Sequence, residues 1–109
     1  MDTRDFTITV TETFETIDRR LNELAVNGVE TYSENDSLSL RFADDSEIRL
    51  AADAASQQLL AAADSDTLLF RFHEIEEQWL DERGSVDLFT WLSTQVTALC
   101  GEIVSLNED

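Results

Sequence analysis

Five carboxylates near the start of the chain have the spacing to collect negative charge on one exposed surface. Residues three or four apart share one face of a helix. The sequence therefore predicts a row of acids along the solvent side of an N-terminal helix, made of Glu12, Glu15, Asp18 and Glu23. Glu30, at the edge of the neighbouring strand, is expected to extend this row. Hard cations prefer carboxylate oxygens, and iron also accepts them. An open row is not a closed cage, so binding should be weak and unselective; the alternative is an ordinary solvated helix face.

One histidine and one cysteine limit other metal or nucleophilic chemistry. With only His73 and Cys100 present, zinc sites of the four-cysteine or two-cysteine, two-histidine kind are excluded by count. His73 can add a nitrogen ligand beside Glu74, but a solvated strand histidine is the simpler interpretation. Cys100 ends an apolar helical stretch, so we interpret it as a small buried hydrophobe. A nucleophilic Cys–His pair is an open alternative, because the chain has one residue of each type.

No motif of an enzyme active site occurs in the sequence. There is no Gly-rich phosphate loop, HExxH helix or GxSxG elbow. A di-iron ferroxidase needs Glu-x-x-His, and the residue three before His73 is Phe70. Asp44, Asp45 and Glu47 crowd one turn without the pattern of an EF-hand loop. We therefore predict that the protein is not an enzyme.

The charge balance restricts the possible partners. The chain has 24 acids and 7 bases, all of them arginine, for a net charge of −17. Such a surface repels nucleic acid and anionic membranes and attracts cations and basic proteins. An alternative contribution is solvation in a salty cytoplasm, where self-repulsion is screened. The acidic start MDTRDF resembles neither a signal nor a transit peptide, so we expect a cytoplasmic bacterial protein in preference to a mature mitochondrial one.

Two stretches have the apolar period of an amphipathic helix. The first is marked by Phe6, Val10, Phe14, Ile17, Leu21 and Leu24. The segment 7–11 alternates locally like a strand, but the longer period favours helix, which Asn27-Gly28 should end. The second helix is marked by Leu88, Leu92, Val96 and Leu99. We expect Ser85 to cap its start and Cys100-Gly101 to end it.

The middle of the chain alternates like strands at 29–33, 38–42, 48–50, 68–73 and 78–81. Segment 57–63 is ambiguous, because its alanines and leucines suit a helix better. The order helix, about five or six antiparallel strands, helix predicts one α+β domain over 1–109. Its expected architecture is a two-layer α/β sandwich with both terminal helices on one face of the sheet.

These residues resemble the frataxin family, in particular its bacterial CyaY branch. The stretch WLDERGSVDLFTWLSTQVTALCGEIVSL, from Trp79 to Leu106, is similar to the family's final strand, turn, last helix and apolar tail. Phe70 and Phe72 fit the preceding strand, and TIDRRL resembles part of the first helix. Arg19 and Asn22 interrupt the run of acids usual in that helix.

The resemblance implies a function and a set of site residues. It implies weak binding of Fe²⁺ and Fe³⁺, with other divalent cations allowed, at Glu12, Glu15, Asp18, Glu23 and Glu30. It implies a monomer that docks on a cysteine desulfurase and an iron–sulfur scaffold protein, and regulates or supplies iron for cluster assembly. Partner contacts are implied at Glu15, Asp18 and Glu23, and on an exposed strand at Gln57 and Leu59, where Leu59 replaces the usual tryptophan.

A different class of protein also fits the composition. Small acidic α/β chaperones of secretion systems have similar size and charge, but they dimerise through an apolar face and bind no iron. This alternative is an acidic protein-binding module without metal function. A dimer by light scattering and no iron binding would favour it, whereas a monomer that binds iron would favour the first hypothesis.

Overall fold

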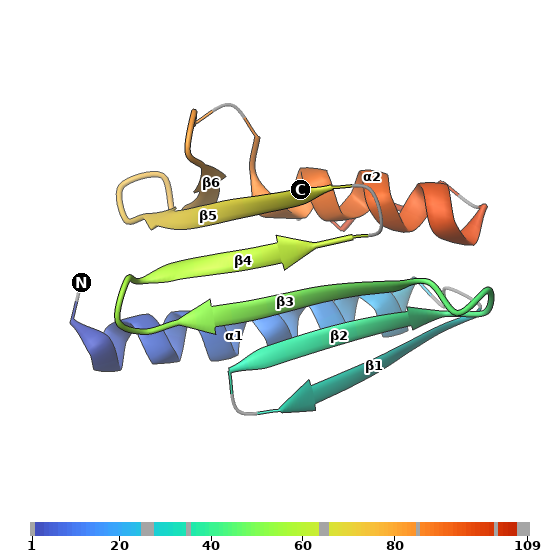
Figure 1. Cartoon of the computed structure of the whole chain (residues 1–109), viewed down its shortest axis with the longest axis horizontal. Helices are drawn as coiled ribbons and strands as arrows, with labels where there is room; N and C mark the ends of the chain where they lie inside the picture. The colour runs from blue at the N-terminus through green and yellow to red at the C-terminus, as the bar shows by residue number, and fades with distance from the viewer. Residues whose placement is uncertain are drawn as a thin grey trace.

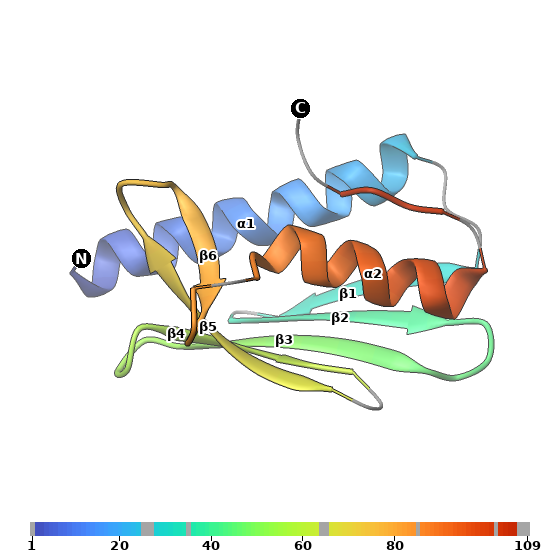
Figure 2. The same ribbon diagram turned by 90° about the horizontal axis from the view of Figure 1, so that it is seen from above.

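A computed structural model describes residues 2–24, 28–34, 36–63, 66–84, 86–101 and 103–106. It contains two helices and six strands in the order α1 Thr3–Glu23, β1 Val29–Glu34, β2 Ser37–Phe42, β3 Glu47–Asp53, β4 Gln58–Ala62, β5 Thr67–His73, β6 Gln78–Asp81 and α2 Leu88–Cys100. Neighbouring strands pair antiparallel in sequence order, from β1 at one edge to β6 at the other. Both helices lie on the same face of this sheet (Figures 1 and 2). The predicted α+β, two-layer α/β sandwich is confirmed.

Helix α1 forms where the longer apolar period predicted it, and the strand-like segment 7–11 is helical. Asp2 caps its start, because its side chain accepts a hydrogen bond from the Asp5 amide at 2.8 Å. The helix ends at Glu23, with Leu24 as its C-cap. Gly28 adopts a left-handed φ of 76° before β1, and Asn27 lies outside the described residues.

Helix α2 begins at a different cap from the one expected. The side chain of Asp87 accepts from the Thr90 amide at 3.2 Å, so Asp87 is the N-cap; Ser85 lies outside the described residues. At the other end, Gly101 adopts φ 77° and its amide bonds the Thr97 carbonyl. A left-handed C-terminal residue favours glycine, and this predicted end is confirmed.

Strand β4 resolves the ambiguity at 57–63, where the composition suits a helix better than a strand. Leu59 pairs with Ala52 of β3 on one side and with Phe70 of β5 on the other. A segment placed between two strands satisfies its backbone groups on both sides, which outweighs the helix propensity of alanine and leucine. The alternation of buried Leu59 and Ala61 with partly or fully exposed neighbours is the period of a half-buried strand.

The core lies between the helices and the covered face of the sheet. It is formed by the apolar stripes of α1 and α2 together with alternate residues of β2 to β6, including Leu40, Leu50 and Phe70, each fully buried. The C-terminal Val104 and Leu106 are also buried. Across the described parts of the chain, neither helix has the length and apolar character to cross a membrane.

Candidate functional site

Two of the predicted acids lie together beside the first strand. Glu15 and Asp18 line a groove of about 390 Å³ between α1 and β1, which we call the α1–β1 groove. The Thr31 hydroxyl donates to Asp18 Oδ1 at 2.6 Å and so fixes that carboxylate against β1. Glu34, at the end of β1, lines the same groove and was not predicted. Two carboxylates of α1 therefore lie beside β1, and Glu34 is a further acidic residue of the lining at the end of that strand.

Glu12 faces a second groove on the other side of α1. This groove lies between α1, the β5–β6 turn, β6 and the start of α2, and we call it the β6 groove. Glu12 and Glu15 are separated by about 60° around the helix axis, and each lines the groove on its own flank of α1. The predicted row of charge is therefore divided by the body of the helix.

Glu23 stands at the C-terminal end of α1 beside two arginines. Its carboxylate lies 3.7 Å from Arg19 Nε and 3.4 Å from Arg20 Nη1. These contacts are exposed, so they contribute little stability. They do place positive charge next to Glu23, which makes it a weaker cation ligand than Glu15 or Asp18.

Glu30 lies on the other face of the sheet, and the expectation that it extends the row on α1 is wrong. Thr31 contacts Asp18 on the helix side, and neighbouring residues of a strand point to opposite faces. Glu30 accepts a hydrogen bond from the Tyr32 hydroxyl. In the strand register, Glu30 lies opposite Arg41 of β2. The hydrogen bond to Glu30 raises the pKa of Tyr32 above its ordinary value.

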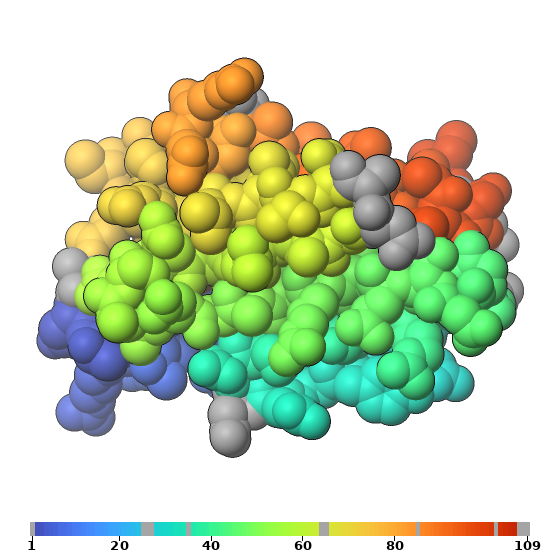
Figure 3. Space-filling model, viewed as in Figure 1, coloured from blue at the N-terminus to red at the C-terminus, as the bar shows by residue number. Residues whose placement is uncertain are grey.

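The expected exposure of Leu59 is also wrong. Leu59 is 0% exposed and packs in the core beneath the helices, whereas Leu60 is 41% exposed on the open face of the sheet. Shifting a strand assignment by one residue exchanges its two faces, which is the error in the sequence assignment. Gln57 is partly buried in the turn before β4, with a left-handed φ of 55°. Figure 3 shows the open face as a broad surface formed by β1 to β5.

The described residues do not include a closed metal-binding cluster. No three carboxylate, histidine or cysteine side chains among them are placed to hold one ion. His73 is exposed and lies 4.0 Å from Glu76, on the β5–β6 turn. Any ion on the described surface would therefore be held by few protein oxygens and would keep much of its water.

The fold and its exposed acidic helix define a class of protein, the two-layer sandwich of the frataxin type. A family model for the frataxin-like domain matches residues 1–102, and the chain belongs to that family. The structure is also similar to that of frataxin from Psychromonas ingrahamii, a protein of the CyaY family. The two superpose with a TM-score of 0.90 at 18% sequence identity, over 99% of this chain and 100% of the other. No curated protein sequence matches this chain.

Sequence reasoning missed the acids that complete each groove. Glu34 is the last residue of a strand with little apolar alternation. Glu74, Glu77 and Asp87 come from regions more than 60 residues after Glu12. Only the pairing of strands and the packing of α1 bring these residues together. The one usable signal was the clustering of acids in the β5–β6 turn.

Proposed function

We propose that this protein is an iron-binding accessory protein of iron–sulfur cluster assembly, without an active site of its own. Membership of the frataxin family supports a role in cluster assembly in general. The finer proposal is that the protein docks on a cysteine desulfurase in the cytoplasm and there regulates the enzyme or supplies iron. The observation that carries it is the α1–β1 groove, which is lined by Glu15, Asp18 and Glu34.

The charge of the protein supports docking on a basic enzyme surface. A net charge of −17 attracts a basic surface over distance and accelerates encounter, and salt weakens that attraction. The groove carboxylates would then meet arginine or lysine side chains of the desulfurase at short range. Iron would bind at the same carboxylates weakly, because few of them converge at any point.

The open face of the sheet supplies a second contact in this proposal. Leu60, in place of the expected Leu59, is the exposed apolar residue of β4, and Arg49 and Arg71 are exposed on the neighbouring strands. We assign this face to the iron–sulfur scaffold protein. A monomer that engages both partners at once would use the two opposite sides of the sandwich.

The proposal is tested by titrating the protein against the desulfurase at increasing ionic strength. The double substitution Glu15→Lys with Asp18→Lys should weaken binding by about one to two orders of magnitude, mainly through slower association. Glu82→Lys, an exposed reversal in the turn after β6, is the control and should have a much smaller effect. Equal losses in both variants, or an affinity that does not respond to salt, would place the interface elsewhere.

Iron binding is measured separately by anaerobic equilibrium dialysis. The neutral variants Glu15→Gln and Asp18→Asn, which lower the charge without reversing it, should lower iron occupancy more than Glu82→Gln does. If occupancy is unchanged, the metal part of the proposal fails while docking can still hold.

A further inference from the structure

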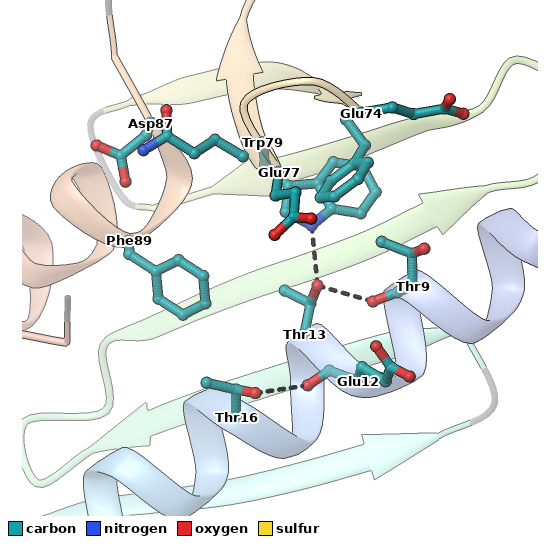
Figure 4. A pocket seen from close by; sticks show the side chains of 11 residues that line it. Thr9, Glu12, Thr13, Thr16, Glu74, Glu77, Trp79, Asp87 and Phe89 are labelled. Atoms are coloured by element: carbon teal, nitrogen blue, oxygen red, sulfur yellow. Dashed lines mark hydrogen bonds between the residues drawn. The ribbon is translucent and has the colours of Figure 1, made fainter. Parts of the chain in front are cut away.

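The β6 groove combines aromatic rings with carboxylates, and the proposed function makes no use of it. It is a hollow of about 580 Å³, within the roughly 300–1,000 Å³ typical of binding pockets. It lies on the flank of α1 away from β1, where the β5–β6 turn rises beside the helix (Figure 2). Its walls come from α1, β5, β6 and the start of α2 (Figure 4).

The aromatic part of the groove is firmly positioned. The Trp79 indole donates to Thr13 Oγ1 at 2.9 Å, and the Thr13 hydroxyl donates to the Thr9 carbonyl at 2.8 Å. Phe72 meets the indole edge to face, with ring centroids 5.4 Å apart. Phe89, partly buried on α2, reaches the groove from the other side. These contacts hold the rings of Trp79 and Phe72 in one arrangement before any ligand arrives.

Acidic residues from three separate elements line the same groove. Glu12 comes from α1, Glu74 and Glu77 come from the β5–β6 turn, and Asp87 comes from the cap of α2. Figure 4 shows the Glu77 carboxylate between β6 and α1, whereas Glu74 extends outward. Among the described lining residues there is no arginine, lysine or histidine. The groove is therefore complementary to a cation.

The lining selects one kind of cation. A metal ion would need several oxygens at one point, and the described residues do not bring three potential ligands together. A guanidinium group is planar, stacks on aromatic rings and pairs with carboxylates through several N–H groups. Ammonium is a more strongly hydrated point charge and uses the rings less well.

We propose that the β6 groove receives an arginine side chain from an exposed basic segment of a partner protein. The guanidinium lies against the rings of Phe72 and Phe89 and is paired by Glu12 and Glu77. This inference goes beyond the proposed function, because it concerns the other flank of α1 and requires neither iron nor the desulfurase.

The test follows the Trp79 indole N–H resonance of the ¹⁵N-labelled protein during titration with short peptides. One acetylated, amidated peptide carries two arginines separated by glycine, and a second carries two lysines with the same charge. The arginine peptide should shift the resonance in a saturable way and bind roughly threefold or more tightly than the lysine peptide. The Trp91 indole, which does not line the groove and donates to Asp66 at 3.4 Å, supplies the reference signal.

Matched substitutions show whether the groove itself responds. Glu77→Gln should weaken the arginine peptide by about three- to tenfold. Glu76→Gln removes the same charge from the same turn, but Glu76 does not line the groove, so it should have little effect. Equal weakening by both substitutions, equal affinity for the two peptides, or shifts that do not saturate would each overturn the proposal. None of these outcomes depends on whether the desulfurase binds at the α1–β1 groove.

Discussion

The covered and open faces of the sheet are formed by alternate residues of the same strands. Leu59 and Leu60 are adjacent in β4, yet one is fully buried and the other is 41% exposed. Under the helices, the sheet presents an almost unbroken apolar layer. On the open face, the same strands present arginine, glutamate and serine with a few apolar side chains. The fold therefore depends on one set of positions and leaves the alternate set available for contacts.

The charge of the protein is also divided between its two sides. Three of the seven arginines, Arg41, Arg49 and Arg71, are exposed on β2, β3 and β5 and point away from the helices. The grooves beside α1 are instead lined by carboxylates. A chain with a net charge of −17 thus has one side that is much less acidic than the other. In the proposed function, the desulfurase and the scaffold protein bind on these two different sides.

The largest expected difference between the faces is in stability. Leu59→Ala should lower the free energy of unfolding by about 2–5 kcal/mol, because it leaves a cavity in the core. Leu60→Ala removes the same atoms from an exposed site and should cost less than about 1 kcal/mol. Urea denaturation of both variants gives the comparison. Similar losses would mean that the two leucines are buried alike and that the register of β4 is different.

The sequence was sufficient to predict the helices and strands whose apolar residues recur at a regular spacing. Both helices and the strands that include Leu40, Ile48 and Phe70 form where the spacing of apolar residues predicted them. Each of these segments buries several side chains on one face, so its phase is set by hydrophobic contacts. The turn at Asp44-Asp45 is also confirmed, and aspartate is a residue that favours tight turns.

The errors occurred where apolar side chains do not fix the phase. Segment 57–63 has leucines and alanines on both faces, so its alternation is hidden and its composition suggests a helix. β1 has no fully buried residue, so the side to which Glu30 points could not be inferred. The grooves depend on contacts between α1 and segments far along the chain. No local pattern records that Glu12 and Glu77 line the same hollow.

A smaller difference is expected at the hydrogen bond that joins the covered face to α1. Thr13→Val keeps the side-chain shape but leaves the buried Trp79 N–H, now bonded at 2.9 Å, without its acceptor. The free energy of unfolding should fall by about 1–3 kcal/mol, measured by urea denaturation. Thr16→Val is the control, because its hydroxyl donates only to the Glu12 carbonyl on the exposed side of the helix. That change should cost less than about 0.5 kcal/mol, and equal costs would argue against a structural role for the Thr13 bond.

The smallest effect is expected on the open face, at the only tyrosine. The hydrogen bond to Glu30, followed by the charge of Glu30, raises the pKa of Tyr32 above 10.0, and Arg41 opposes this shift. Because the folded state favours the neutral phenol, the contact stabilises the fold below the ordinary pKa. That contribution is lost as the pH rises through the folded pKa. Ultraviolet absorbance of the phenolate reports this single group directly.

Glu30→Gln should move the pKa of Tyr32 back toward its ordinary value of about 10. Glu34→Gln, on the same strand and with the same change of charge, is the control and should leave most of the shift in place. The result decides where Glu30 belongs. If Glu30→Gln leaves the Tyr32 titration unchanged, Glu30 is directed away from the open face, and it regains a place beside Asp18 in the α1–β1 groove. If the pKa falls as expected, the acids predicted as one row lie on different sides of the protein, and the proposed site in the α1–β1 groove depends on Glu15 and Asp18.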